Sequence, residues 1–191
     1  KLFERDAPDG HRRRGDVGNT AIKRVAIFTH SNPDPDAIGS MMAVEWMLMK
    51  LYRIECCSFY NGMLSHPQNI AMVNLIDPNL RPVKEYVPAD FDLRILVDTV
   101  PANAGLGVHL VSFELVIDHH KEIPNGGFNG LFINLKAGSC CGTVYHLLKL
   151  AGLELEDDNE TDSKLATAVM VGISTDTESL MSDDATNYEF D

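Results

Sequence analysis

The chain contains few cysteines, and none lies at a spacing that binds zinc or forms a redox pair. Among its 191 residues, the four cysteines stand as two adjacent pairs, Cys56-Cys57 and Cys140-Cys141. Adjacent cysteines rarely bridge each other, and both pairs lack the two-residue gap of zinc knuckles and redox motifs. We therefore expect buried free thiols in a reducing, cytoplasmic location rather than a disulfide framework.

Long apolar runs are also missing. The most apolar stretch, residues 37–51, is interrupted by Ser40, Glu45 and Lys50, whereas a membrane span needs roughly 18 uninterrupted residues. The first residues are polar and rich in arginine, without the apolar stretch of a secretory signal. The sequence thus predicts neither a membrane segment nor a secretory signal.

Basic residues are scarce relative to acidic ones. Lys and Arg number 16 against 28 Asp and Glu, a formal net charge of −12. Residues 1–20, which hold the run Arg12-Arg13-Arg14, show no hydrophobic period and predict a polar linker or arm. An acidic body repels a polyanion, so we do not expect long duplex nucleic acid as a partner. A phosphate ligand could bind this acidic body only if metal ions neutralised the repulsion between them.

Apolar residues suffice for a core, at 45% of the chain against 23% charged residues. Short apolar runs alternate with segments of helical period. We expect strands at residues 25–29, 54–59, 93–97 and 113–117, and helices at 37–51, 67–75, 142–150 and 163–172. This alternation predicts one α/β domain over residues 21–191, a doubly wound, mainly parallel sheet with helices on both faces.

Histidine and aspartate follow three of the expected strands directly. In chain order these residues are His30, Asp34, Asp36, Asp98, Asp118, His119 and His120. Ligand sites gather at the carboxyl ends of parallel strands, so we expect the three clusters to converge on one crevice. Carboxylates at such short spacing would repel one another unless divalent cations lie between them.

The mixture of imidazole and carboxylate suits Mn²⁺, Mg²⁺, Co²⁺ or Zn²⁺ rather than a thiolate zinc site. Because the set is larger than one ion needs, we expect two ions that share a carboxylate. Such pairs, about 3.5–4 Å apart, serve in-line displacement at phosphorus. One aspartate after a strand is more often a helix cap or turn residue, so the prediction depends on all three clusters.

The same residues resemble the motifs of the DHH phosphoesterase superfamily. Five segments match in order: HSNPDPDAIGS at 30–40, VDT at 97–99, IDHH at 117–120, GSCCGT at 138–143 and GISTDT at 172–177. The resemblance covers about residues 24–180. The segment at 34–40 looks more like the branch that degrades short oligonucleotides, adenosine bisphosphates or cyclic dinucleotides than like the inorganic pyrophosphatase branch.

The resemblance implies two divalent metal ions, with Mn²⁺ expected first and Mg²⁺ or Co²⁺ as alternatives. It places His30 and Asp34 on one ion and Asp36 and His119 on the other. Two further carboxylates would contact or bridge both ions, and these are Asp98 and Asp176.

Four other residues receive roles from the same resemblance. Asp118 would orient a neighbouring histidine, and His120 would be catalytic together with Asp98, donating to a phosphoryl oxygen or protonating the leaving oxygen. Ser139 and Thr143, at the start of an expected helix, would bind substrate phosphate. The alternative for Ser139 is simple helix capping.

The implied activity is hydrolysis of phosphoester bonds by a water that two metal ions activate. The expected substrate is a small phosphorylated molecule: a dinucleotide, a short oligonucleotide or a nucleoside bisphosphate. Hydrolysis of pyrophosphate or polyphosphate is the alternative reaction, and a nucleotide- or metal-sensing module without turnover is the alternative of another class. The family usually adds a second, basic and glycine-rich domain, which these residues do not contain, and a homodimer is one oligomeric option.

Overall fold

Among the residues that the structure describes, six parallel strands form one sheet in the order β3-β2-β1-β4-β5-β6. The computed structural model describes residues 22–107, 112–124 and 128–190, so the expected arm at residues 1–20 and its arginine run lie outside the described residues. The strands are β1 (Arg24–Ser31), β2 (Glu55–Asn61), β3 (Leu80–Pro82), β4 (Leu93–Val97), β5 (Leu115–Ile117) and β6 (Leu131–Ile133).

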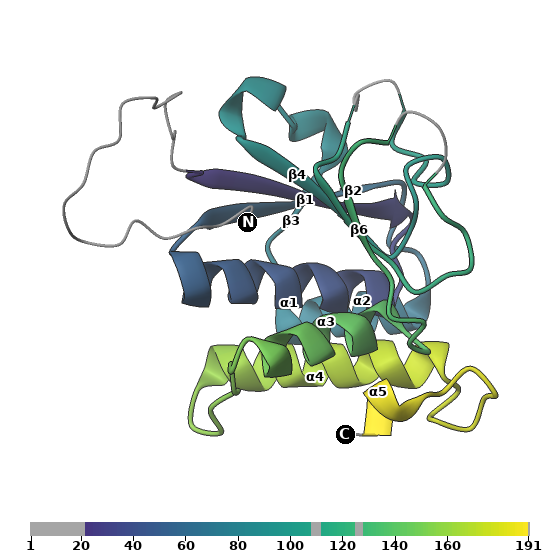
Figure 1. Ribbon diagram of the computed structural model, residues 1–191. Helices are drawn as coiled ribbons and strands as arrows, with labels where there is room; N and C mark the ends of the chain where they lie inside the picture. Colours follow the sequence, from purple (N-terminus) through teal and green to yellow (C-terminus); the bar gives the residue numbers. More distant parts are fainter. Residues whose placement is uncertain (1–21, 108–111, 125–127, 191) are drawn as a thin grey trace, which may run out of the picture.

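In the described part of the chain, five α-helices and two short 3₁₀ helices connect or follow the strands. They are α1 (Pro35–Tyr52), α2 (Pro67–Ile76), η1 (Val83–Glu85), η2 (Pro88–Asp90), α3 (Cys140–Leu150), α4 (Glu160–Asp176) and α5 (Asn187–Phe190). The helices α1 to α4 lie together on one side of the sheet (Figure 1). The predicted α/β fold with a doubly wound parallel sheet is confirmed.

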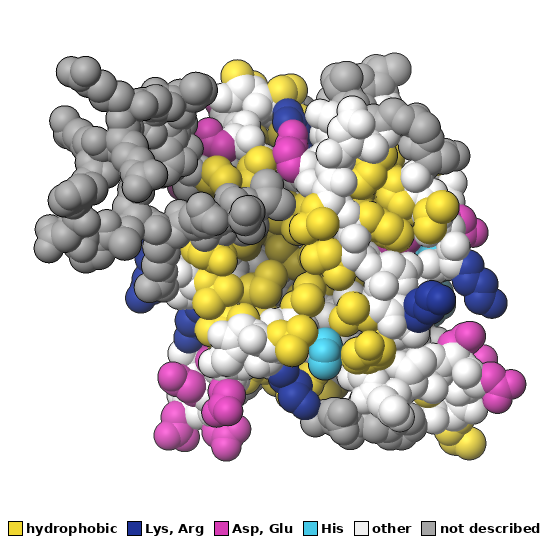
Figure 2. Space-filling view, viewed as in Figure 1, with side chains coloured by type: hydrophobic (Ala, Val, Ile, Leu, Met, Phe, Trp, Pro, Cys, Tyr) yellow, Lys and Arg dark blue, Asp and Glu magenta, His cyan; other side chains and the backbone are white. Residues whose placement is uncertain are grey.

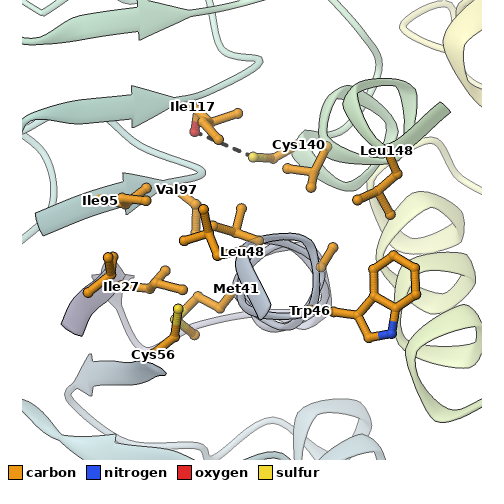
Figure 3. Packing of buried hydrophobic residues seen from close by; sticks show 14 of the residues in the cluster. Ile27, Met41, Trp46, Leu48, Cys56, Ile95, Val97, Ile117, Cys140 and Leu148 are labelled. Carbon is orange, nitrogen blue, oxygen red and sulfur yellow. Dashed lines mark hydrogen bonds between the residues drawn. The ribbon is translucent and has the colours of Figure 1, made fainter. Parts of the chain in front are cut away.

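Side chains alternate along β1 between two separate cores. Val25 and Ile27 face the α-helices, where Ile27 lies close to Met41 of α1 (Figure 3). Ala26 and Phe28 face the opposite side, where Phe28 meets the ring of Tyr86 edge-on at 4.9 Å. In the described part of the chain this second face is covered by η1, η2 and loops (Figure 1). Among the described residues, the long helices therefore lie on one face of the sheet, whereas the sequence predicted helices on both.

The first helix begins earlier than its apolar period indicates. Asp34 caps it by accepting a hydrogen bond from the Ala37 N–H at 2.9 Å, and Pro35 occupies the first turn, where its missing N–H costs nothing. Likewise β1 extends to Ser31, two residues past the expected strand end. Consequently His30 belongs to a strand and Asp36 to a helix, so both side chains are held by regular structure.

Three helices approach closely beside the start of α1. A Cβ atom built on Gly39 of α1 or on Gly172 of α4 would lie 2.6 Å from the Cys141 sulfur of α3. Only glycine fits at contacts this short. The two glycines of the first and last matched motifs therefore let α1, α3 and α4 bring their ends together.

The short outer strands were not expected from the sequence. β3 and β6 have three residues each, too few for a visible alternation of apolar and polar side chains. The strand expected at residues 113–117 is shortened to β5, and α4 continues four residues past its expected end at residue 172.

The four cysteines are free and buried, as expected. In the described residues, no helix combines the length and apolar character that crossing a bilayer requires. Acidic side chains gather at the lower left of the surface in Figure 2, over the turn between α3 and α4.

Candidate metal centre

The six residues expected to bind metal lie together at the carboxyl ends of the strands. The β1 arrowhead marks this edge on the right of Figure 1. His30 stands at the end of β1, and Asp34 and Asp36 stand at the start of α1. Asp98 directly follows β4, His119 lies in the loop after β5, and Asp176 is the last residue of α4. Convergence of the expected clusters on one crevice is therefore what the structure shows.

Three groups of three side chains are each close enough to hold one ion. Two of them consist of expected metal ligands alone, and the third combines Asp98 and His119 with His120. In the first, His30 Nε2 lies 3.3 Å from Asp98 Oδ2 and 3.9 Å from Asp34 Oδ2. His30 donates its Nδ1–H to the Ser31 carbonyl at 3.0 Å, which directs the Nε2 atom toward the carboxylates. The first group can thus offer one imidazole nitrogen and two carboxylate oxygens.

The second group is centred on His119. Its Nε2 atom lies 3.3 Å from Asp176 Oδ2, 3.4 Å from Asp98 Oδ1 and 3.8 Å from Asp36 Oδ2. The ligand atoms of His119, Asp36 and Asp176 all lie within 4.8 Å of one another. Like the first group, it offers one imidazole nitrogen and two carboxylate oxygens.

Asp98 stands between the two groups. One of its carboxylate oxygens faces His30 and the other faces His119. Its backbone has φ of +59°, a left-handed conformation that aspartate tolerates better than most residues. The chain therefore turns sharply as it leaves β4 and sends a side chain that is only 2% exposed into the middle of the cluster.

Two atoms at this centre are buried without a hydrogen-bond partner among the described residues. They are Asp98 Oδ1 and His119 Nε2. Orphaned buried polar atoms are rare because each one costs desolvation energy. A cation between these two ligand atoms would satisfy both, so the donor set fits a bound metal.

Burial and neighbouring charges shift the pKa of three groups in the cluster. Burial opposes the charged form of His30, but its hydrogen bond with Asp98 raises its pKa to about 9. Burial acts in the same way on His119, whereas its contacts with Asp176 and Asp98 raise its pKa to about 11. Burial and the negative charges of Asp98 and Asp176 raise the pKa of Asp36. A divalent cation would compete with protons for the same ligand atoms.

Asp36 is fixed by the start of α3. Its two carboxylate oxygens accept hydrogen bonds from the backbone N–H groups of Cys140, at 2.6 Å, and Cys141, at 2.8 Å. These donors belong to the positive end of a helix, which favours an anion. The helix start that was expected to receive substrate phosphate thus holds a carboxylate of the protein instead.

Ser139 and Thr143, which were expected to contact substrate, lie inside the protein. Both side chains are fully buried, at 0% exposure. Ser139 caps α3 by accepting the Gly142 N–H at 2.9 Å, and Thr143 Oγ1 donates to the Ser139 carbonyl. The capping alternative considered for Ser139 describes its role.

Asp118 and His120 form a pair beside the metal cluster. His120 donates its Nδ1–H to Asp118 Oδ1 at 2.8 Å, and the same oxygen accepts the His119 N–H at 2.9 Å. The hydrogen bond with Asp118 raises the pKa of His120. Asp118 is fully buried, whereas half of the His120 side chain is exposed, so His120 is the member that can reach a bound molecule.

A cavity of about 330 Å³ opens over these residues. Six residues considered above line it, together with Thr99 of the matched VDT segment and three residues that had not been singled out from the sequence: Val100, Asn103 and Glu122. They lie in irregular loops without a hydrophobic period, and only their place just after Asp98 or His120 could have pointed to them.

Comparison with known proteins places the chain in a family. The model of the DHH family, N-terminal domain, matches residues 24–173. An uncharacterized protein of Methanocaldococcus jannaschii is 30% identical over 152 residues, which cover 80% of this chain and 30% of that protein. The chain belongs to the DHH family, and the resemblance seen in its motifs is confirmed.

Two further similarities extend this result. A protein of Lactobacillus acidophilus named "Probable manganese-dependent inorganic pyrophosphatase" is 28% identical over 82% of this chain and 48% of its own length. The structure of an exopolyphosphatase-related protein from Bacteroides fragilis superposes with a TM-score of 0.66 at 14% identity, covering 88% of this chain and 50% of that one. At this identity the structural match concerns the fold alone. The chain spans less than half the length of the two curated relatives.

Proposed function

We propose that this chain carries the metal-binding half of a hydrolase that cleaves phosphorus–oxygen bonds with two divalent ions. The observation that carries the proposal is the position of Asp98, whose two oxygens face two separate groups of ligands. His30 and Asp34 would hold one ion, and Asp36, His119 and Asp176 the other, with Asp98 shared. The Mn²⁺ dependence in the name of the Lactobacillus relative supports manganese as the ion.

Ions bound in this cluster would acidify a water molecule and neutralise phosphate charge. The protein groups around the cluster have separate roles. The backbone of α3 keeps Asp36 in place, and the Ser31 carbonyl orients His30. Asp118 holds the Nδ1–H of His120, so the Nε2 atom of that imidazole is available to donate a proton to a phosphoryl or leaving oxygen.

We expect replacement of His120 by alanine to separate metal binding from turnover. His120 lines the cavity, and its Nδ1 atom pairs with Asp118 at 2.8 Å rather than with Asp98, which lies 4.0 Å away. We therefore assign His120 to the reaction and not to an ion, so Mn²⁺ affinity should stay unchanged within about twofold. The rate should fall roughly 10²–10⁴-fold if His120 is a general acid. Calorimetric titration with Mn²⁺ and a steady-state assay measure the two quantities, and His66→Ala, an exposed histidine on the α2 side, is the control. Loss of metal together with rate would show that His120 is a ligand.

Metal removal should change stability as well as activity. A ligand that binds only the folded state stabilises it by about 2.7 kcal/mol at a hundred times its Kd. Adding Mn²⁺ should therefore raise the midpoint of thermal unfolding, and chelation should reverse the change. The Asp98→Asn variant should show little of this response. If the midpoint of thermal unfolding does not change as Mn²⁺ is added, the protein has no such site.

The proposed bond is a phosphoester of a small nucleotide or short oligonucleotide, and a phosphoanhydride is the second candidate because of the name of the Lactobacillus relative. The test is product release from a 5′-phosphorylated diadenylate, from adenosine 3′,5′-bisphosphate and from pyrophosphate, each with Mn²⁺ and after chelation. Turnover of the nucleotides that requires the ion supports the first candidate, and turnover of pyrophosphate alone supports the second. Nucleotide and ion binding without any turnover would identify a sensing module.

A further inference from the structure

The residues that line the cavity fall into two chemical groups. The first consists of imidazoles and carboxylates, among them His30, Asp98 and Asp176. The second belongs to the loop after β4 and consists of Thr99, Val100 and Asn103. No Lys or Arg is among the described residues that line the cavity. We call the second group the neutral wall.

The loop that bears this wall is fastened to the ends of β1 and β2. The Ser31 N–H donates to the Ala104 carbonyl at 3.0 Å, and the Ser31 hydroxyl donates to the Gly105 carbonyl at 2.9 Å. Asn61 Nδ2 donates to the same Gly105 carbonyl at 2.7 Å. Gly105 has φ of +64°, and a Cβ atom there would lie 2.4 Å from the Ser31 oxygen. A wall held this firmly is preorganised for recognition.

Asn103 presents a carboxamide at the cavity without an internal partner. Its backbone N–H donates to the Val100 carbonyl at 2.9 Å, which closes a turn. Its side chain is exposed and forms no hydrogen bond with the described residues. A carboxamide offers a donor and an acceptor side by side, so both remain free for a bound molecule.

The wall is unsuited to a second phosphate group. A phosphate needs cations or several N–H donors around its oxygens, whereas the neutral wall offers a buried valine, a hydroxyl and one neutral amide. Glu122 adds a carboxylate to the same cavity and would repel further negative charge. A neutral organic group with its own donor and acceptor matches the carboxamide better, and nucleobase edges and ribose hydroxyls have this character.

We propose that Asn103 determines specificity by hydrogen bonding to the neutral, nucleoside-like part of a phosphate ester whose phosphoryl group lies at the metal cluster. This inference rests on the proposed function, because the phosphoryl group must lie at that cluster. Asn103 lies outside the matched motifs. It would favour phosphate esters whose organic group can form hydrogen bonds over esters whose organic group is only an aromatic ring.

The test compares Asn103→Ala with the unchanged Asn103, both in the full chain carrying His120→Ala and loaded with Mn²⁺, whose slow turnover leaves the esters intact during the measurement. Calorimetry measures binding of the 5′-phosphorylated diadenylate and of p-nitrophenyl phosphate, whose ring has no donor. We expect the Kd for the dinucleotide to rise about tenfold, as for loss of one neutral hydrogen bond. The Kd values for p-nitrophenyl phosphate and for Mn²⁺ should change less than twofold.

Two controls keep the outcome unambiguous. Asn74→Ala, which removes an exposed carboxamide from α2, should alter none of these values. An unchanged Kd for the dinucleotide, or equal weakening for both esters, would overturn the assignment of Asn103. Binding is measured independently of hydrolysis. Failure of the proposed function would therefore appear as absence of turnover by the unchanged protein, and not as a change in Kd.

Discussion

Replacing Asp98 by alanine is expected to abolish metal-dependent hydrolysis while the fold stays largely intact. Both ligand groups use this one carboxylate, at 3.3 Å from His30 Nε2 and 3.4 Å from His119 Nε2. Its loss therefore weakens both ion sites at once. The assay is Mn²⁺-dependent product release, which should fall to the background rate, with circular dichroism to show the retained fold.

The asparagine variant makes this test sharper. Asn tolerates the left-handed backbone at φ of +59°, where alanine would add strain. Asp98→Asn also preserves the shape of the side chain but cannot bridge two cations with charge. Asp90→Asn, an exposed carboxylate near the opposite end of β4, is the matched control. An Asp98→Asn protein with full activity would mean that no shared carboxylate is needed.

Gly172→Ala is expected to damage the site through packing alone. The added Cβ would lie 2.6 Å from the Cys141 sulfur, 3.0 Å from the Asp36 Cα and 3.1 Å from the Pro35 carbonyl oxygen. Overpacking of this kind costs about 1–3 kcal/mol, which exceeds the roughly 1 kcal/mol by which alanine is favoured over glycine in a helix. Relief of the clash displaces either Cys141, whose N–H holds the Asp36 carboxylate, or the Asp36 backbone itself. Mn²⁺ affinity should therefore fall together with the free energy of unfolding.

Urea unfolding and Mn²⁺ titration measure these two effects. Thr167→Ala, on the exposed face of the same helix, should change stability by no more than about 0.5 kcal/mol. Adding Cys141→Ala to Gly172→Ala should recover part of the loss, because the closest of the three contacts is removed and neighbouring sites couple. Wild-type stability and affinity in Gly172→Ala would show that the helices are not packed as closely as described.

The chemistry at the strand ends could be predicted because it depends on local order in the chain. A buried parallel strand followed by His or Asp places that side chain at the carboxyl edge of the sheet. This placement does not depend on the conformation of the loops. His30, Asp98 and His119 needed nothing more than this. Asp176 is different: it comes at the end of a helix, and only the resemblance to the family motif pointed to it.

Other parts of the site depend on tertiary contacts that leave no periodic signal. The helix start at Ser139 has the composition of an anion site, but which anion it binds depends on how close α1 comes. Because Gly39 and Gly172 allow a close approach, Asp36 occupies that position. Asn103 belongs to a loop whose place is set by hydrogen bonds to β1 and β2 ends, which are distant in the sequence.

The central claim is that two divalent ions share Asp98, and anomalous diffraction near the manganese absorption edge tests it most directly. Crystals of the protein grown with Mn²⁺ should give two peaks, one contacting His30 and the other His119, with an oxygen of Asp98 at each. A single peak, or a pair in which only one ion contacts Asp98, would contradict the account.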